Sequence, residues 1–232
     1  MKTNYLTLFF IVATFAIILI LFYFVIIDVF YKPLNIKAGN KIDEVRIGED
    51  IWMKKNLDVD CFRNGDLIPN IESAEEWEEA AVNGQPAWCY YYNSSDYGEK
   101  YGKLYNWFAV NDPRGLAPEG FHIPTDSEWT TLTSYFGRER RYAGEKTIEI
   151  GLIYWDVPNT GVTNESDFSA LLGGYRYIDG SFTNFRVTTL FWSATENSNY
   201  NAWYRLLYNF SSSGSRINYY KCFGAYVRCL RD

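Results

Sequence analysis

The segment from Gly120 to Leu132 constrains local structure more tightly than any other part of the chain. Thr125 followed three residues later by Glu128 forms a capping box, in which each side chain accepts a hydrogen bond from the backbone amide of the other residue. Pro124 comes directly before the cap and holds the entering chain extended. The sequence therefore predicts an abrupt turn into a helix at Thr125.

The residues after this cap have the spacing of an amphipathic helix. Trp129, Leu132 and Phe136 recur at i, i+3 and i+7, which places them on one face. Gly137 then offers the left-handed conformation that commonly ends a helix. We expect a short helix with a single apolar face.

Similar local signals predict two more elements in the first half of the chain. Val45–Met53 has the pattern of two short strands joined at Gly48–Asp50. Ser73 and Glu76 form a second capping box, and the helix that it starts is expected to run towards Gly84. Its expected buried residues are Trp77, Ala80 and Ala81.

The order of the remaining elements indicates the fold class. A third helix is predicted over Gly102–Val110, ended by Asp112–Gly115. Beyond Gly151, short aromatic runs separated by Gly, Asn and Ser indicate an antiparallel sheet with long loops. Helices early and strands late predict an α+β domain. The residues expected to be buried in the third helix are Leu104, Tyr105, Phe108 and Ala109.

Several motifs in a fixed order suggest a family. They are Ile47–Leu57, Tyr101–Trp107, Gly120–Leu132, Asn159–Ser166, Phe168–Arg176, Phe191–Glu196, Ala202–Arg205 and Gly224–Asp232. With these motifs the chain closely resembles the Fibrobacter succinogenes major paralogous domain from about Val45 onward. That family looks like a distant relative of formylglycine-generating enzymes and of C-type lectin-like folds. The resemblance implies a C-type lectin-like domain with short helices beside a small antiparallel sheet, a scaffold used for binding.

The N-terminal segment has the composition of a membrane span. Tyr5–Ile27 is almost wholly apolar and uncharged, which is about the length that crosses a bilayer. A cleaved signal peptide would have a shorter apolar core and small residues at its exit. We expect residues 1–31 to form a signal anchor, residues 32–41 a tether and residues 42–232 the globular domain.

Charge around this segment leaves its orientation open. Lys2 precedes it, whereas Lys32, Lys37, Lys41 and Arg46 follow, and the positive-inside bias would place the domain in the cytoplasm. The cysteines and the family resemblance favour export instead. Our prediction is a single-pass protein of the cell membrane with an exported domain, periplasmic or extracellular.

The overall charge speaks against one class of partner. The chain has 28 Asp and Glu against 22 Lys and Arg, for a net charge of −6. Nucleic-acid binding needs a concentrated basic surface. No nucleic-acid partner is therefore expected.

Four cysteines in an exported domain favour disulfides. Cys222 and Cys229 lie seven residues apart in a predicted strand, so their side chains would point to opposite faces unless Gly224 makes a turn. Cys89 and Cys229 match positions where the resembled family often has cysteine. The resemblance thus favours the pairs Cys89–Cys229 and Cys61–Cys222, while reduced, buried thiols remain the alternative.

Catalytic and metal-binding patterns are scarce in the sequence. His122, the one histidine, lies in a turn where a structural role is expected, and a lone histidine excludes a multi-histidine metal site. Formylglycine-generating enzymes use a closely spaced cysteine pair, which Cys222 and Cys229 do not match. We therefore expect no enzyme activity, cofactor or metal, with a redox enzyme as the minor alternative. The oxygens of Asp156, Asn159, Asn164, Glu165 and Asp167 could bind calcium, but the favoured interpretation is a polar loop that holds its own turns by side-chain hydrogen bonds.

The C-terminal region has the composition of a binding surface. More than half of the residues between Ser193 and Tyr220 are Asn, Ser or Tyr, the chemistry of antibody combining sites. Solvated hairpins whose tyrosines cap the sheet are the alternative. Some lectin-like proteins are hypermutated in this region by diversity-generating retroelements, and the sequence leaves open whether this chain is one of them. Trp192, Trp203 and Phe223 are expected in the core. The candidate ligand-binding residues are Asn199, Tyr200, Asn201, Tyr204, Asn209, Arg216, Asn218, Tyr219 and Tyr220.

The sequence as a whole therefore predicts a membrane-anchored adhesion or recognition domain. Its expected ligand is a glycan or a protein, bound without catalysis. A structural envelope protein that self-associates is the alternative of a different class.

Overall fold

The computed structural model describes residues 42–135, 167–208 and 211–232. From Asp43 onward they belong to one compact unit, Asp43–Asp232. The predicted signal anchor and tether, residues 1–41, lie outside the described residues. Within the described ranges, no helix is both long and apolar enough to span a membrane.

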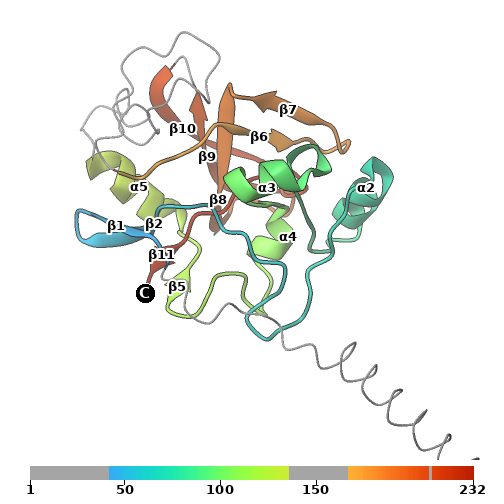
Figure 1. Ribbon diagram of the computed structural model, residues 1–232, viewed down its shortest axis with the longest axis horizontal. Helices are drawn as coiled ribbons and strands as arrows, with labels where there is room; N and C mark the ends of the chain where they lie inside the picture. The colour runs from blue at the N-terminus through green and yellow to red at the C-terminus, as the bar shows by residue number, and fades with distance from the viewer. Residues whose placement is uncertain (1–41, 136–166, 209–210) are drawn as a thin grey trace, which may run out of the picture. The chain divides into compact units, whose positions relative to one another are not determined.

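Short helices and strands alternate in the first half, and strands fill the second (Figure 1). The first half contains β1 (Glu44–Ile47), β2 (Asp50–Met53), α2 (Ala74–Val82), β3 (Trp88–Cys89), η1 (Tyr91–Asn93), α3 (Ser95–Tyr101), β4 (Leu104–Tyr105), α4 (Trp107–Val110), β5 (Phe121–His122) and α5 (Asp126–Tyr135). The second half contains β6 (Gly173–Arg176), β7 (Phe182–Phe185), β8 (Thr188–Glu196), β9 (Asn201–Tyr208), β10 (Ser211–Tyr220) and β11 (Leu230–Arg231). The predicted α+β class is confirmed.

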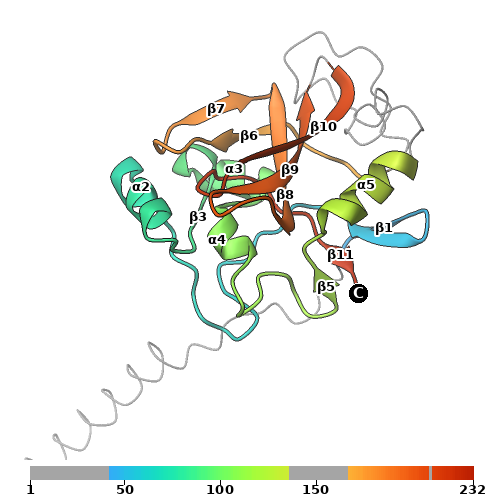
Figure 2. The ribbon, with the colours of Figure 1, turned by 180° about the vertical axis from the view of Figure 1, so that it is seen from behind.

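The largest sheet has five strands in the order β10-β9-β8-β6-β7. Its neighbours are antiparallel except for β6 and β8, which run parallel. A four-stranded sheet has the order β1-β2-β11-β5, and β3 pairs with β4. Figures 1 and 2 show α2 and α5 at opposite ends of the domain, with the five-stranded sheet between them.

The C-terminal segment connects these sheets. Gly224 pairs with Arg176 and Ala225 with Tyr105, while Tyr226 pairs with Phe191. Further along, β11 inserts between β2 and β5. The segment predicted as one strand is therefore a series of short bridges to different sheets, because each of its residues meets a different partner.

An aromatic cluster fills the core between α5 and the sheets. The rings of Trp52 and Trp129 are 5.0 Å apart, and that of Phe168 is 5.7 Å from Trp52. Phe191 is 5.7 Å from Trp129 on the β8 side. The Trp129 indole N–H donates to the carbonyl of Trp192 at 3.2 Å, which fixes α5 on β8.

Arg176 is fully buried and ties α2 to the five-stranded sheet. Its guanidinium donates to the carbonyls of Glu72 at 2.8 Å, Ser73 at 2.9 Å and Gly180 at 3.0 Å. It also lies 4.4 Å from the Trp77 ring centroid. A buried charge is tolerated when its donors are satisfied in this way.

Arg228 plays the same part at the other end of the core. Its side chain is 1 % exposed and donates to the carbonyls of Met53 at 3.0 Å and Phe168 at 2.6 Å. A further bond reaches Asn56 Oδ1 at 2.8 Å. Three segments distant in sequence thereby meet at one side chain.

The Gly-Gly pair of the Phe168–Arg176 motif is explained by close packing. A Cβ on Gly173 would lie 2.3 Å from the Tyr226 hydroxyl oxygen, and one on Gly174 would lie 2.5 Å from the Thr183 carbonyl oxygen. Gly174 also has a φ of +69°. A larger residue would displace the Tyr226 side chain at Gly173 and the backbone of β7 at Gly174.

The capping box at Thr125 forms as predicted, whereas at Ser73 only the serine half of the predicted box is present among the described residues. The Glu76 amide donates to Ser73 Oγ at 3.0 Å at the start of α2, whose Trp77 and Ala80 are buried. At α5, the Thr125 amide donates to Glu128 Oε2 at 2.7 Å, and the Glu128 amide to Thr125 Oγ1 at 3.3 Å. The opening hairpin is confirmed too, with Val45 opposite Trp52. Trp129 and Leu132 are buried, and Phe136 and Gly137 lie outside the described residues.

The helix predicted over Gly102–Val110 is only partly correct. Gly102, with a φ of +76°, ends α3, and the next residues form β4 instead. Asn106 then starts the four-residue helix α4 by accepting from the Ala109 amide at 3.1 Å. Pairing with β3 overrides the local helical pattern of this segment.

Candidate functional site

Three of the nine candidate ligand-binding residues line one pocket. Asn199 and Tyr200 lie in the turn between β8 and β9, and Tyr220 ends β10. Tyr200 is 76 % exposed and Tyr220 is 45 % exposed, which is unusual for large aromatic side chains. Contiguous exposed apolar surface of this kind often marks an interaction site.

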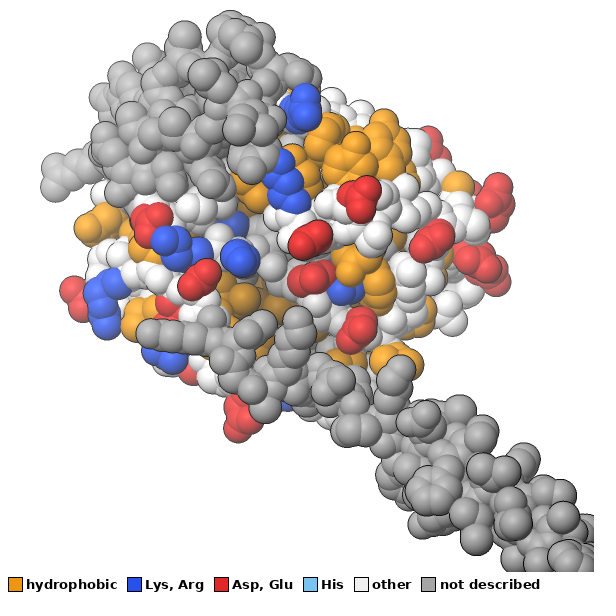
Figure 3. Space-filling view, in the orientation of Figure 1, with side chains coloured by type: hydrophobic (Ala, Val, Ile, Leu, Met, Phe, Trp, Pro, Cys, Tyr) orange, Lys and Arg blue, Asp and Glu red, His pale blue; other side chains and the backbone are white. Residues whose placement is uncertain are grey.

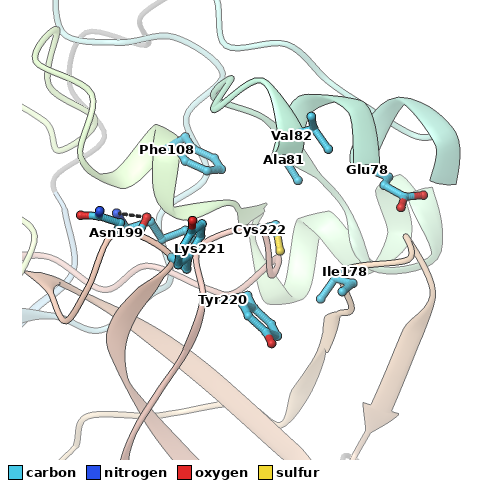
Figure 4. Close-up of a pocket in the computed structure, with 10 residues that line it drawn as sticks. Glu78, Ala81, Val82, Phe108, Ile178, Asn199, Tyr220, Lys221 and Cys222 are labelled. Atoms are coloured by element: carbon cyan, nitrogen blue, oxygen red, sulfur yellow. Dashed lines mark hydrogen bonds between the residues drawn. The ribbon is translucent and has the colours of Figure 1, made fainter.

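The opposite wall of the pocket comes from helix α2. Ala81, Val82 and Glu78 of α2 face Tyr220 across the cavity (Figure 4). Phe108 of α4 and Ile178 of the β6–β7 turn complete the apolar lining, and the cavity volume is about 250 Å³. Val82 is 83 % exposed, so the apolar surface continues onto the helix.

The polar groups of the pocket floor already have partners inside the protein. Lys221 is buried, forms an ion pair with Glu196 and donates to the Asn199 carbonyl at 3.0 Å. The Cys222 carbonyl accepts from the Trp77 indole N–H at 2.9 Å. The floor therefore presents mainly apolar surface to a ligand.

Arg216 and Tyr204 lie elsewhere in the fold. The Arg216 guanidinium lies 3.4 Å from the Trp203 ring centroid and forms an ion pair with Asp126 at 2.8 Å. Tyr204 is buried, and its ring meets Trp192 edge-on at 6.0 Å. Burial raises the pKa of Tyr204. Its predicted exposure to ligand is therefore wrong, because Tyr204 lies in the buried middle of β9 and does not line the pocket.

Asn201, Asn218 and Tyr219 lie on the paired ends of β9 and β10 without lining the pocket. Asn201 donates to Asn218 Oδ1 at 3.4 Å across the β9–β10 pair. The ring of Tyr219 packs 4.7 Å from Phe223 and 4.8 Å from Tyr220, which supports the Tyr220 ring. Asn209 lies outside the described residues. As predicted, Trp192 and Phe223 are buried, whereas Trp203 is half-buried beneath Arg216.

Sequence reasoning missed the contribution of α2. Val82 is apolar but lies off the buried face formed by Trp77 and Ala80. An apolar residue on the outer face of α2 could have indicated a binding surface there. Phe108 and Ile178 gave no such signal, because only the fold brings them beside Tyr220.

All four cysteines are free thiols, so neither predicted disulfide is formed. Cys89 lies in β3 opposite Leu104, in the two-stranded sheet. The Cys229 carbonyl instead accepts from the Met53 amide of β2, in the four-stranded sheet. The geometry thus corresponds to the alternative of reduced thiols. Burial raises the pKa of the Cys89 thiol to about 12, and that of Cys229 to about 12 as well.

The pKa values of the other two thiols are raised as well. Burial raises the pKa of Cys222, and burial together with Asp60 raises that of Cys61. A thiol, unlike a thiolate, is a weak nucleophile and a poor metal ligand.

His122 is held between two carboxylates. Its Nδ1 lies 2.8 Å from Asp232 Oδ1, and its Nε2 lies 3.0 Å from Glu128 Oε1. Burial alone would lower the pKa of His122, but the bonds to Asp232 and Glu128 outweigh it and the pKa lies above 6.5. The ring thus links β5 to the capping box of α5, in agreement with a structural role.

Metal ligands do not gather in the described part of the chain, where no group of three His, Cys, Asp or Glu side chains could hold an ion. Of the conceivable calcium ligands, Asp156, Asn159, Asn164 and Glu165 lie outside the described residues. Asp167 forms an ion pair with Lys54.

The family comparison agrees with the motif order. The model of the Fibrobacter succinogenes major domain matches residues 45–231, which is most of the chain. The chain therefore belongs to the Fibrobacter succinogenes major domain family, as the resemblance predicted. No curated protein and no solved structure matches it.

Proposed function

We propose that this member of the Fibrobacter succinogenes major domain family is a non-catalytic recognition domain. It binds a glycan or protein ligand in the pocket between α2 and the ends of β8 to β10. An N-terminal membrane helix holds it at the cell surface, with the domain exported. The observation that carries this proposal is the apolar pocket edged by exposed Tyr200, Tyr220 and Val82.

The chemistry of the edge supports binding. Tyrosine offers a rigid amphipathic surface at a low cost in conformational entropy. Tyr200 is bonded through its backbone, with the amide donating to Ser198 Oγ at 3.3 Å and the carbonyl accepting from Lys221 at 2.9 Å. The main chain is thus held while the ring stays available for contact.

A lectin-like use of the scaffold fits this arrangement. One side of the pocket comes from the β8–β9 turn, the β6–β7 turn and the end of β10, where loops can vary without disturbing the core. Raised thiol pKa values argue against redox chemistry at Cys222 and Cys229.

Self-association is the second candidate, because exposed Val82, Tyr200 and Tyr220 could also meet another copy of the chain. Sedimentation of the purified chain separates the two. A concentration-dependent dimer that Tyr200→Ser dissociates would favour the structural envelope protein.

The direct test uses the full chain in detergent micelles on glycan and peptide arrays. The Tyr200→Ser/Tyr220→Ser double variant should weaken binding at least about tenfold, as expected when hot-spot aromatics are removed. Tyr135→Ser is the matched control, because Tyr135 is 63 % exposed on α5 at the other end of the domain. Absence of any ligand, or binding that the double variant leaves unchanged, would contradict the proposal.

A further inference from the structure

We infer that the occupant of this pocket is a polypeptide segment with one apolar side chain flanked by Lys or Arg. The inference rests on the proposed function and names the ligand class for the same pocket. It follows from the size and polarity of the cavity and from the charge around it.

The size of the cavity suits one anchoring group. Pockets that enclose drug-sized ligands measure roughly 300 to 1,000 Å³, whereas this one measures about 250 Å³. A single side chain can fill it, while the rest of the ligand lies across the exposed edge formed by Val82 and Tyr200.

The polarity of the floor favours an apolar side chain over a sugar ring. A buried hydroxyl needs a hydrogen-bond partner, and leaving it without one costs free energy. The Lys221 ammonium and the Cys222 carbonyl are already bonded within the protein. These two groups therefore offer a sugar hydroxyl no new partner, whereas Leu or Phe would bury apolar surface against Phe108 and Ile178.

The charge around the cavity is negative. Helix α2 reads Ala-Glu-Glu-Trp-Glu-Glu-Ala-Ala-Val and contains no Lys or Arg. Glu75, Glu78 and Val82 occur at i, i+3 and i+7, so the two carboxylates follow the face that carries the pocket edge. Figure 3 shows acidic side chains gathered along the end of the domain that carries α2.

These carboxylates are available to a ligand. Among the described residues, no ion pair involves Glu75, Glu78 or Glu79. Asp179, next to Ile178 on the far side of the pocket, is exposed and bonded to the Ser181 amide at 2.9 Å. Lys221, the cation in the lining, is neutralised by Glu196.

An apolar cavity with Glu78 in its lining and further carboxylates on the same helix is complementary to an apolar side chain with cationic neighbours. Charges of this kind steer association and select the partner, and their effect falls as salt screens them. The apolar contact supplies the affinity, and the glutamates supply the preference for Lys and Arg.

The experiment measures binding of the full chain in detergent to fluorescent peptides by anisotropy. The probe is Lys-Lys-Leu-Lys-Lys, compared with the same peptide carrying central Ser and with Glu-Glu-Leu-Glu-Glu. We expect the Ser peptide to bind about tenfold more weakly and the Glu peptide not to bind. Affinity for the lysine probe should fall as salt is raised from about 50 to 300 mM.

Two charge variants locate the effect. Glu78→Lys should weaken the lysine probe about tenfold, since an attraction is replaced by a repulsion. Glu119→Lys changes the net charge equally from an exposed site before β5 and should have little effect. Equal losses in both variants would show only a long-range effect of net charge and would overturn the inference.

The outcomes separate the two proposals. If the pocket binds a neutral glycan such as chitohexaose, with loss in Tyr200→Ser, but not the lysine probe, recognition stands and the peptide inference fails. If neither probe binds and the arrays give no ligand, both proposals fail. If the lysine probe binds and Glu78→Lys alone weakens it, both are supported.

Discussion

The buried arginines and the pocket edge differ in how their side chains are enclosed and bonded. Arg176 and Arg228 are almost fully enclosed, and their guanidinium groups bond to backbone carbonyls from several segments. Tyr200 and Tyr220 leave large rings in solvent, and no side-chain hydrogen bond of either is present among the described contacts.

This difference separates what builds the domain from what it can offer a partner. The arginines bridge α2, β2 and the C-terminal segment, so their removal would affect positions far along the chain. The pocket edge is attached through backbone bonds and contributes little to the core. Side chains there can change with the ligand while the scaffold remains.

The largest effect is expected for Arg228→Met. The substitution leaves the carbonyls of Met53 and Phe168 and the side chain of Asn56 without their shared donor. Leaving a buried hydrogen-bond acceptor without a donor costs about 1–3 kcal/mol, and the substitution affects three of them. Chemical denaturation followed by tryptophan fluorescence measures the change in the free energy of unfolding.

Arg231→Met is the control, because Arg231 is half-exposed and pairs with Glu44 at the surface. An exposed ion pair contributes only about 0–1 kcal/mol. If both variants lost the same stability, burial of Arg228 would not make it more important for the fold than a surface arginine. The contrast with the pocket edge would then weaken.

Much of the framework was predictable because its signals are local. Ser73 with Glu76 and Thr125 with Glu128 specify helix starts within four residues. The helix predicted from Gly102 was partly wrong because the competing interaction, pairing of β4 with β3, is not local. The roles of Arg176 and Arg228 could not be derived, since most of their carbonyl partners lie 60 or more residues away.

The pocket was half predictable for a related reason. Enrichment in Asn and Tyr identified Asn199, Tyr200 and Tyr220, which are close in the folded chain. It also selected Tyr204, since composition does not distinguish the two faces of β9. The α2 wall came from a segment more than a hundred residues earlier, and only the fold brings it into contact.

Thr125→Ala tests a polar group that stabilises the fold from the surface. Its expected effect lies between those of the buried arginines and of the pocket edge. It removes the hydroxyl that accepts from the Glu128 amide at 3.3 Å and donates to Glu128 Oε2 at 2.8 Å. Loss of such a cap costs about 1 kcal/mol. Thermal unfolding should show it, with Thr131→Ala in the exposed middle of α5 as a nearly neutral control. If both substitutions lowered the melting temperature equally, the capping hydrogen bonds of Thr125 would add no stability of their own.

His122 predicts a pH dependence of the stability of the domain. Its pKa in the folded state lies above 6.5 because the bonds to Asp232 and Glu128 outweigh burial. A raised folded-state pKa gives stability that is present below about pH 6.5 and lost as pH rises through the folded-state value. The melting temperature of His122→Gln should therefore approach that of wild type as pH increases to about 8.5. An NMR titration placing the imidazole pKa below 6.5 would contradict this.

The smallest effect on stability is expected for Tyr200→Ser, and it tests the other side of the comparison. The Tyr200 ring is 76 % exposed, and the substitution keeps the backbone bonds that hold the turn. Surface changes of this kind usually alter stability by less than about 0.5 kcal/mol. Tyr226→Phe is the matched buried control: it removes the hydroxyl that donates to the Gly173 carbonyl at 3.0 Å, which should cost about 1 kcal/mol or more. A loss above about 1 kcal/mol for Tyr200→Ser would make the pocket edge part of the framework. Loss of binding without loss of stability would instead assign the ring to recognition alone.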